Sequence, residues 1–330
     1  MMNNPLSGAI ELKHVYKSYD DTPVLKDISF VVRRGESKII LGGSGSGKST
    51  ILKLIIGLEK ADEGEIWVDG EEISTYNERK LMEVRKKIGM VFQEGALFDS
   101  LSVGQNQGRD AAKLFGGGTA AHPKVIARIY GNQGDYGTTK YKQGQDQFLK
   151  PLIAAGKLKV ACESYTPGWD PAKAQSEVEQ CLTKTNNRLD GIVVMNDGTA
   201  GGAIAALKSQ NLLGKVPVVG GQDADLQAIQ YILLGYQYDT VYKPFKLQAS
   251  EAASLTADVL KDGKLPAGTV DGYVPNGFMK PGVPAKFLPV QLLHKDTINK
   301  VVDDGVWTWK QICAGATART PTCVKELKGA

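Results

Sequence analysis

The sequence has no run of about 18 apolar residues, the length that a membrane-spanning helix requires, so we expect no transmembrane helix. Its first residues, MMNNPLSGAIELKHVY, lack the basic and then apolar regions of a secretory signal peptide, and we expect a cytoplasmic location as synthesised. The net charge is only +4, and Lys and Arg are dispersed along the chain, which argues against nucleic-acid binding.

Cysteine is missing from the first 160 residues, and the four that follow are Cys162, Cys181, Cys313 and Cys323. Cys313 and Cys323 bracket the short polar segment AGATARTPT, a spacing compatible with a disulfide-closed loop of an exported protein. The alternative is four free thiols, two of them buried. No Cys/His cluster with metal-ligand spacing is present, so we expect no structural metal site.

One motif for phosphate binding stands in the first fifty residues. Apolar residues 39–41 predict a strand that runs into GGSGSGKST, and the amphipathic segment TILKLIIGL predicts a helix after it. In such a loop, successive backbone N–H groups and the helix N-terminus face phosphate oxygens. Lys48 can reach the β- and γ-phosphates, and the Ser49 hydroxyl can ligate Mg²⁺. The alternative is a flexible Gly/Ser loop, which does not explain the lysine or the flanking elements.

Residues 9–104 resemble the N-terminal part of an ABC-transporter ATP-binding subunit. The stretches that carry the resemblance are IELKHVYKSYDDTPVLKDISFVVRRGE, the P-loop, GLEKADEGEIWVDGEEI and KKIGMVFQEGALFDSLSV. The resemblance implies that Tyr19 stacks on adenine (Tyr16 is a weaker candidate) and that Gln93 is the Q-loop residue near Mg²⁺. The implied ATP and Mg²⁺ site comprises Tyr19, Gly42, Gly43, Ser44, Gly45, Ser46, Gly47, Lys48, Ser49, Thr50 and Gln93, with Ser49 and Gln93 at the metal.

Several parts of an ATPase are missing from the sequence. Residues 101–105 read LSVGQ, close to the LSGGQ signature of that family, but they begin only eight positions after Gln93 and leave no room for the helical subdomain in between. VVGGQDAD, at 218–225, follows an apolar strand and is also no signature. No apolar strand ends in Asp-Glu, and none of the three histidines follows such a strand. Because phosphoryl transfer depends on these groups, we assign no catalytic residue and expect no efficient hydrolysis.

From residue 104 the pattern changes to β/α alternation. The predicted strands are VIARIYG, KVACESY, GIVVMN, VPVVGG and DTVYKP, and the predicted helices are QFLKPLIAAG, PAKAQSEVEQCLTK, AGGAIAALKSQ, DLQAIQYILLG and FKLQASEAASLTADVLKDG. Apolar strands separated by helices predict a parallel sheet that is covered on both faces. Polar residues and a tryptophan follow the strands, where ligands of such sheets bind.

The order GWDP, NDGTAGGA, GGQDAD and VYKP resembles periplasmic sugar-binding proteins of the ribose/xylose type. That resemblance implies that Trp169 stacks on the sugar ring and that Asn196, Asp223 and Lys243 hydrogen-bond its hydroxyls, with Asp197 a weaker candidate. Each has a structural alternative: Trp169 as a surface turn residue, the Asn196-Asp197 pair as a helix N-cap, and Lys243 as a solvated strand end.

Together these observations predict an α/β protein in which a P-loop ATPase N-terminal fragment, residues 1–103, is joined to a parallel-sheet (Rossmann-like) lobe of a type I periplasmic binding protein, residues 104–330. A complete ATPase subunit and a complete sugar receptor would need roughly 500 residues, so neither is whole. We therefore expect a hybrid, whether engineered, recombined or an assembly error, that binds ATP/Mg²⁺ and weakly a monosaccharide such as a pentose. The alternatives are a sugar-binding protein of an ABC importer with an ATPase remnant, a working ATPase, and a fold-only engineered chimera in which both sites are relics. ABC membrane subunits are expected partners by resemblance only.

Overall fold

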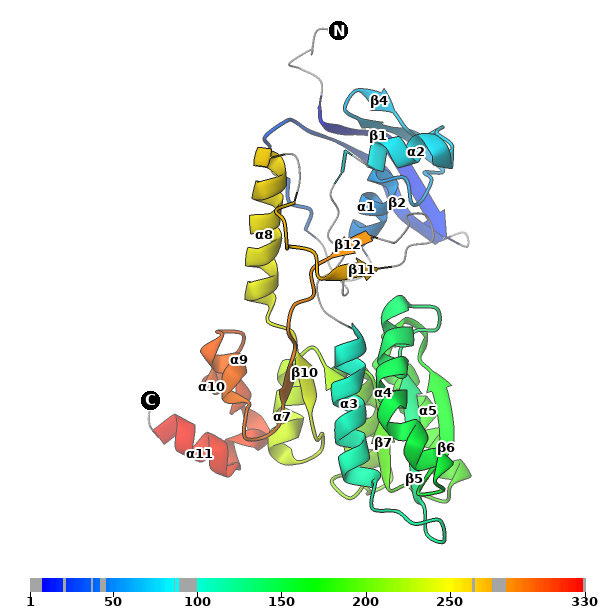
Figure 1. Ribbon diagram of the computed structural model, residues 1–330, viewed down its shortest axis with the longest axis vertical. Coiled ribbons are helices and arrows are strands. Elements are labelled where there is room, and N and C mark those ends of the chain that lie inside the picture. Colours follow the sequence, from blue (N-terminus) through cyan, green and yellow to red (C-terminus); the bar gives the residue numbers. More distant parts are fainter. Residues whose placement is uncertain are drawn as a thin grey trace. The chain divides into compact units, whose positions relative to one another are not determined.

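The computed structural model describes residues 8–19, 22–36, 38–41, 46–85, 87–88, 100–262, 265–274 and 283–328. The chain forms two compact units, Met1–Val91 and Phe92–Ala330 (Figure 1). Each unit has its own hydrophobic core. No described helix combines the length and the apolar character needed to cross a membrane.

The first unit is built on an antiparallel sheet of strand order β2-β1-β3-β4. Its elements are β1 (Ile10–Tyr19), β2 (Thr22–Val32), α1 (Lys48–Ile55), β3 (Glu63–Val68), β4 (Glu71–Glu72) and α2 (Glu78–Arg85). Alternate residues of β1 and β3, such as Leu12 and Ile66, pack against Leu54 of α1 and Leu81 of α2. The two helices thus cover one face of this sheet.

The prediction of a strand at residues 39–41 is wrong. Residues 38–41 belong to no strand, and the side chains of Ile39 and Leu41 are 81% and 88% exposed. A strand needs a hydrogen-bonding neighbour, and residues 39–41 pair with none of the strands in the described sheet β2-β1-β3-β4. The apolar pattern alone therefore does not produce a strand here.

The second unit contains the predicted parallel sheet. Strands β5 (Lys124–Tyr130), β6 (Leu158–Tyr165), β7 (Gly191–Val193) and β8 (Val218–Val219) run parallel in the order β6-β5-β7-β8. Gly220, with φ of 102°, separates β8 from β9 (Gly221–Gln222), which pairs in parallel with β10 (Thr240–Tyr242). The antiparallel β13 (Gln291–Leu293) follows β10 at the edge.

Helices cover both faces of this sheet, as predicted. Ala111 and Phe115 of α3 (Ser100–Phe115) and Leu149 of α4 (Tyr136–Ala154) pack on Ile126 and Val193. The opposite face carries α5 (Pro171–Lys184), α6 (Asp197–Ser209) and α7 (Leu226–Leu234). Helix α8 (Phe245–Asp262) follows β10, and none of the side chains that the structure describes in it is buried.

The segment LSVGQ forms the first turns of α3. Val103 is fully buried in a cluster with Tyr130, Tyr141 and Met195, so the predicted boundary after residue 103 falls inside an element of the second unit. Gly104 lies so close to α4 that a Cβ atom there would be 2.2 Å from the carbonyl oxygen of Tyr141. The glycine thus serves the packing of α3 against α4, which lie side by side (Figure 1).

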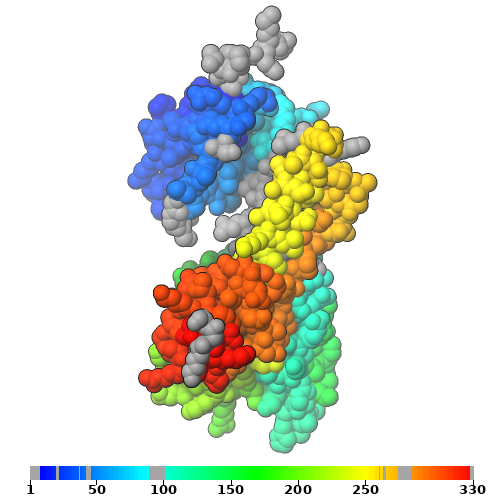
Figure 2. Space-filling model, turned by 90° about the vertical axis from the view of Figure 1, so that its left-hand side faces the viewer, coloured from blue at the N-terminus to red at the C-terminus, as the bar shows by residue number. Residues whose placement is uncertain are grey.

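The C-terminal residues pack on α7. The hairpin β11 (Gly272–Val274) and β12 (Val283–Ala285) precedes β13, and four short helical segments follow it: α9 (Asn299–Asp303), α10 (Trp309–Ile312), η2 (Gly315–Arg319) and α11 (Pro321–Lys328). Figure 2 shows α9, α10 and α11, in orange-red and red, gathered on one face of the second unit. Ile298, Val301 and Ile312 contribute to the same buried cluster as Ile229 and Ile232 of α7.

Two disulfide bonds lie in the second unit. The predicted bond between Cys313 and Cys323 is present. A second bond, which the sequence did not predict, joins Cys162 of β6 to Cys181 of α5. The alternative of four free thiols is therefore wrong.

Candidate functional site

A cavity of about 470 Å³ lies where the parallel strands of the second unit end. Trp169, Asn196, Asp223 and Lys243 all line it, so the structure brings together the four residues that the sequence selected for sugar binding. They follow β6, β7, β9 and β10, respectively. The remaining walls come from Tyr141, Gly168, Gln222, Ala224, Asp225, Phe245, Gln248, Val306 and Trp307.

The Trp169 ring is held in place by contacts within the protein. Trp169 ends the short helix η1 (Pro167–Trp169) and has a φ of 57°, a backbone conformation that non-glycine residues rarely adopt. Its Nε1 donates a hydrogen bond of 2.8 Å to Asp135. The ring packs on Gly131, where a Cβ atom would lie 2.0 Å from it. Trp169 does occupy a turn, but its ring is anchored, unlike that of an ordinary surface turn residue.

The loop before α4 supports this ring. The carboxylate of Asp135 accepts from the side-chain amide of Asn132 as well as from Trp169. The Asn132 oxygen in turn accepts from the backbone N–H of Gly168 at 3.0 Å. These polar residues of GNQGDYG therefore position the tryptophan, and neither Asn132 nor Asp135 lines the cavity.

Asn196 is both a helix N-cap, the structural alternative, and a residue of the cavity wall, as sugar binding requires. It is the N-cap of α6, and its Oδ1 accepts from the backbone N–H of Thr199 at 2.8 Å. Its side chain also lines the cavity. Because the cap uses the oxygen, the amide nitrogen is the group that Asn196 can offer to a ligand.

Asp197, the weaker sequence candidate, is not part of the cavity wall. Its side chain is buried and accepts three hydrogen bonds, from Asp225 N (2.9 Å), Thr240 Oγ1 (3.0 Å) and Gln237 Nε2 (2.9 Å). Burial, and after it the charge of Asp223, raise the pKa of Asp197 well above its usual range. This residue ties the 223–225 segment to β10 and acts as a structural support.

Asp223 and Lys243 form an ion pair in the cavity wall, with 3.0 Å between Nζ and Oδ1. The Lys243 side chain is only 12% exposed, so it is no solvated strand end. Asp223 has φ of 97° and the next residue, Ala224, has φ of 54°. Such strained backbone is typical of functional sites.

The sequence did not predict some of the residues that line the cavity. Trp307 lies in the C-terminal segment, and its Nε1 donates a 2.9 Å hydrogen bond to the carbonyl oxygen of Ala224. Tyr141, on α4, meets the Trp169 ring edge-on, with ring centroids 6.3 Å apart. Gln222 directly precedes Asp223, and its place at the end of the strand VPVVGGQ is a signal that could have identified it.

The predicted nucleotide site is described only in part. Gly42, Gly43, Ser44, Gly45 and Gln93 lie outside the described residues, so the Ser49–Gln93 metal pair and most of the loop stay predictions.

The described remainder keeps one feature of a phosphate site. Gly47, with φ of 85°, is the N-cap of α1, whose first three residues are Lys48, Ser49 and Thr50. Lys48 Nζ donates to Ser46 Oγ at 3.3 Å. Tyr19 lies at the end of β1 and is 37% exposed, as is Tyr16.

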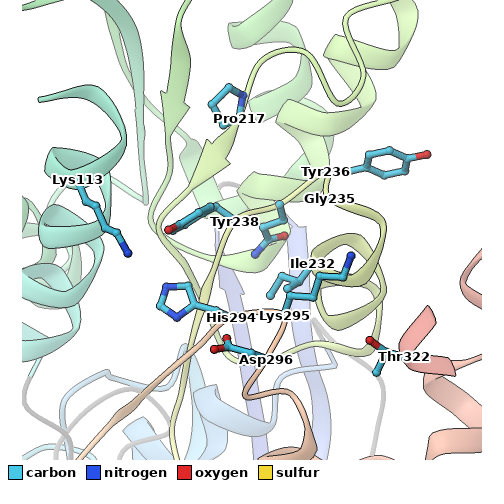
Figure 3. A pocket seen from close by; sticks show the side chains of 11 residues that line it. Lys113, Pro217, Ile232, Gly235, Tyr236, Tyr238, His294, Lys295, Asp296 and Thr322 are labelled. Atoms are coloured by element: carbon cyan, nitrogen blue, oxygen red, sulfur yellow. The ribbon is translucent and has the colours of Figure 1, made fainter. Parts of the chain in front are cut away.

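A second cavity of the second unit, about 690 Å³, contains none of the predicted site residues (Figure 3). Pro217, which precedes β8, lies in its wall, so this cavity is at the amino ends of the strands. The His294 ring meets Tyr238 edge-on with centroids 5.3 Å apart. Its Nε2 is hydrogen-bonded to the buried Asp110, which turns the imidazole toward the protein interior.

Comparison with known proteins gives matches to two kinds of transport protein. Residues 96–265 match the family described as periplasmic binding protein domain. The D-xylose-binding periplasmic protein of Haemophilus influenzae is 40% identical over 183 residues, 55% of this chain and 53% of that protein. Methionine import ATP-binding protein MetN 1 of Staphylococcus aureus (strain N315) is 31% identical over 197 residues, 56% of this chain and 57% of that protein. The chain spans about half the length of these curated relatives.

Among solved structures, an ABC transporter solute binding protein from Clostridium phytofermentans with bound β-D-glucose matches with a TM-score of 0.57 and 24% identity. The match covers 65% of this chain and 68% of that one. At this identity the similarity concerns the fold.

Proposed function

Because the chain belongs to the periplasmic binding protein domain family, we propose that its second unit binds a monosaccharide, with the pentose D-xylose as first candidate, as the solute-binding part of an ABC importer. This unit has the α/β type I periplasmic binding protein fold with a parallel sheet. One observation carries the proposal: the four residues selected from the sequence line a single cavity at the carboxyl ends of the strands.

The cavity has the chemistry that a sugar requires. The Trp169 ring offers a flat apolar face for the C–H groups of a pyranose ring. Lys243 donates and Asp223 accepts hydrogen bonds, and the amide nitrogen of Asn196 adds a neutral donor. The volume of about 470 Å³ lies within the range of small-molecule sites.

The relatives support this choice of ligand class. The Haemophilus relative is named as D-xylose-binding, and the Clostridium structure contains β-D-glucose. Since the chain spans about half of the curated relatives, the importer's membrane subunits are proposed partners only. The two disulfides are typical of exported domains, whereas the cytoplasmic location expected above stays a prediction.

Isothermal titration with D-xylose tests the proposal. We expect saturable heat, with an affinity that is at least about tenfold weaker in Asp223→Ala and unchanged in Lys295→Met, a control in the wall of the other cavity. D-glucose and D-ribose, titrated in parallel, rank the ligands. Absence of saturable heat with all three sugars at millimolar concentration would refute sugar binding.

Binding of Mg·ATP by the first unit is a second candidate function. The observation that favours it is α1 beginning at Lys48 directly after the left-handed Gly47, which leaves backbone N–H groups at the helix N-terminus for an anion. The similarity to an ATP-binding import protein supports the same interpretation. Titration with Mg·ATP should then give heat without steady release of phosphate, and Lys48→Ala should abolish it. Silence with ATP would leave the first unit as an ATPase remnant beside a sugar-binding domain.

A further inference from the structure

Gln222 has an unusual environment in the wall of the 470 Å³ cavity that contains Asp223 and Lys243. It is the last residue of β9, it lines the cavity, and only 4% of it is exposed. Within the described part of the chain, its Oε1 atom has no hydrogen-bond partner. A buried polar group in this state is costly, and an explanation is needed for its retention.

The neighbours of Gln222 do not supply the missing partner. The preceding Gly221 faces Asp197 and Gln237, since a Cβ there would lie 2.3 Å from an atom of each. Successive strand residues face opposite sides, so Gln222 faces away from that polar network. Val241, beside it in the ladder, is apolar, and the carboxylate of Asp223 is an acceptor that Lys243 already occupies.

We propose that Gln222 is a further ligand of the sugar, whose side-chain amide hydrogen-bonds one ring hydroxyl and makes the site selective for sugars that carry it. The proposal rests on the proposed sugar binding and deepens it. A hydroxyl group both donates and accepts, and a primary amide does the same. Rotation of the amide by half a turn exchanges its oxygen and nitrogen, so either end can face the cavity.

The role of Gln222 differs from that of Asp223 and Lys243. The charged pair attracts any polyol, because carboxylate and ammonium groups bind hydroxyls in many orientations. A buried neutral amide has one direction of approach, and it is left unpaired when an analogue lacks the matching hydroxyl. Sites of this kind reject the deoxy analogue strongly. Gln222 therefore determines specificity at one hydroxyl position.

The test is isothermal titration of D-xylose and its 2-, 3- and 4-deoxy analogues into the full chain and into Gln222→Leu. We expect Gln222→Leu to bind D-xylose about tenfold more weakly, the size of one hydrogen bond. One deoxy analogue should bind the unaltered chain and Gln222→Leu with the same affinity. This analogue lacks the hydroxyl that the Gln222 amide would bind, so removing the amide costs it nothing further. The melting temperature of Gln222→Leu should be equal or higher, since an unpaired buried group has been removed.

A matched control is Gln227→Leu, on α7 and outside the cavity. It should bind all four sugars as the unaltered chain does. Equal weakening of every sugar in Gln222→Leu would mean a structural role, and unchanged xylose binding would mean no role; either result overturns the inference while sugar binding stands. No xylose heat in the unaltered chain overturns the proposed function and this inference together.

Discussion

Lys243 donates a hydrogen bond across 3.0 Å to Asp223, and both side chains line the cavity at the ends of β9 and β10. The two charges are thus paired with each other. A sugar hydroxyl placed between them can accept from Lys243 and donate to Asp223, so that neither charge is left alone on binding.

This pairing predicts non-additive mutations. Asp223→Ala should weaken xylose binding at least about tenfold and should also destabilise the fold, because Lys243, only 12% exposed, loses its ion pair with Asp223. Lys243→Met should weaken binding similarly. The double variant should be no weaker than the worse single variant, as measured by titration and thermal unfolding in a double-mutant cycle. Strict additivity would show that the pair is not coupled.

A second prediction concerns the anchoring of Trp169. In Gly131→Ala the new Cβ would overlap the Trp169 ring, being placed 2.0 Å from it, so the ring must move. We expect at least about tenfold weaker sugar binding, the effect of misplacing a stacking face, and a shifted tryptophan fluorescence maximum. Gly117→Ala is the control, since a Cβ there meets nothing within 4 Å. Equal binding by the two variants would contradict the importance of this anchor.

The sequence predicted this site because four of its residues obey a local rule. Trp169, Asn196, Asp223 and Lys243 each follow an apolar segment that forms a strand, and parallel strands bring such positions to one edge. Trp307 obeys no such rule. It reaches the cavity because the C-terminal segment packs on α7, and long-range packing of this kind leaves no periodic signal in the chain.

The α3–α4 contact yields a third prediction, on stability. Gly104→Ala should lower the free energy of unfolding by about 1–3 kcal/mol, since the added methyl group meets the backbone of Tyr141. Gly201→Ala on α6 has its nearest atom 3.8 Å away and should stabilise by about 0.4–1 kcal/mol. Urea unfolding of both variants checks the difference. A stable Gly104→Ala variant would mean that the helices can separate without cost.

A fourth prediction concerns pH. Burial raises the pKa of Asp239 well above its usual range; the hydrogen bond from Gly220 N opposes the shift and the charge of Asp110 adds to it. The groups around Asp239 are Asp110, which contacts His294, and Asp197.

Since its pKa is higher in the folded than in the unfolded protein, the folded state binds the proton more tightly. The stabilisation is complete below the unfolded pKa, near 4, and is lost as the pH rises through the raised folded value. Asp239→Asn cannot ionise, so its melting temperature should fall less between pH 5 and 9 than that of the unaltered chain. The exposed Asp303→Asn serves as control. Parallel melting curves for Asp239→Asn and the unaltered chain would disprove the assignment.

The fifth prediction concerns residues 38–41, where the strand expected from the sequence does not form. The double variant Ile39→Ser, Leu41→Ser should reduce aggregation, measured by light scattering, because two highly exposed aliphatic side chains are removed. Its thermal stability should stay within about 0.5 kcal/mol of the original. Ile40, which is partly buried against the core of the first unit, provides the contrast: Ile40→Ser should destabilise that unit. Equal loss of stability in both variants would contradict this arrangement.

The failure at residues 39–41 has a physical cause. Three consecutive apolar residues favour a strand only where a neighbouring strand accepts their hydrogen bonds, and residues 39–41 pair with none of the strands that the structure describes. The prediction of β5, β6, β7 and β10 succeeded because each of them pairs in parallel with a strand of another β/α unit.

The bond between Cys162 and Cys181 fastens β6, the outermost strand in the described order β6-β5-β7-β8, to the helix that packs behind it. An outermost strand is the one from which a sheet frays and to which a foreign strand can attach. While the disulfide is intact, β6 cannot separate from the sheet unless α5 moves with it. A thiol-reducing environment would break the bond and remove that restraint. The folded domain should therefore last longer, and aggregate less, on the oxidising side of a cell envelope.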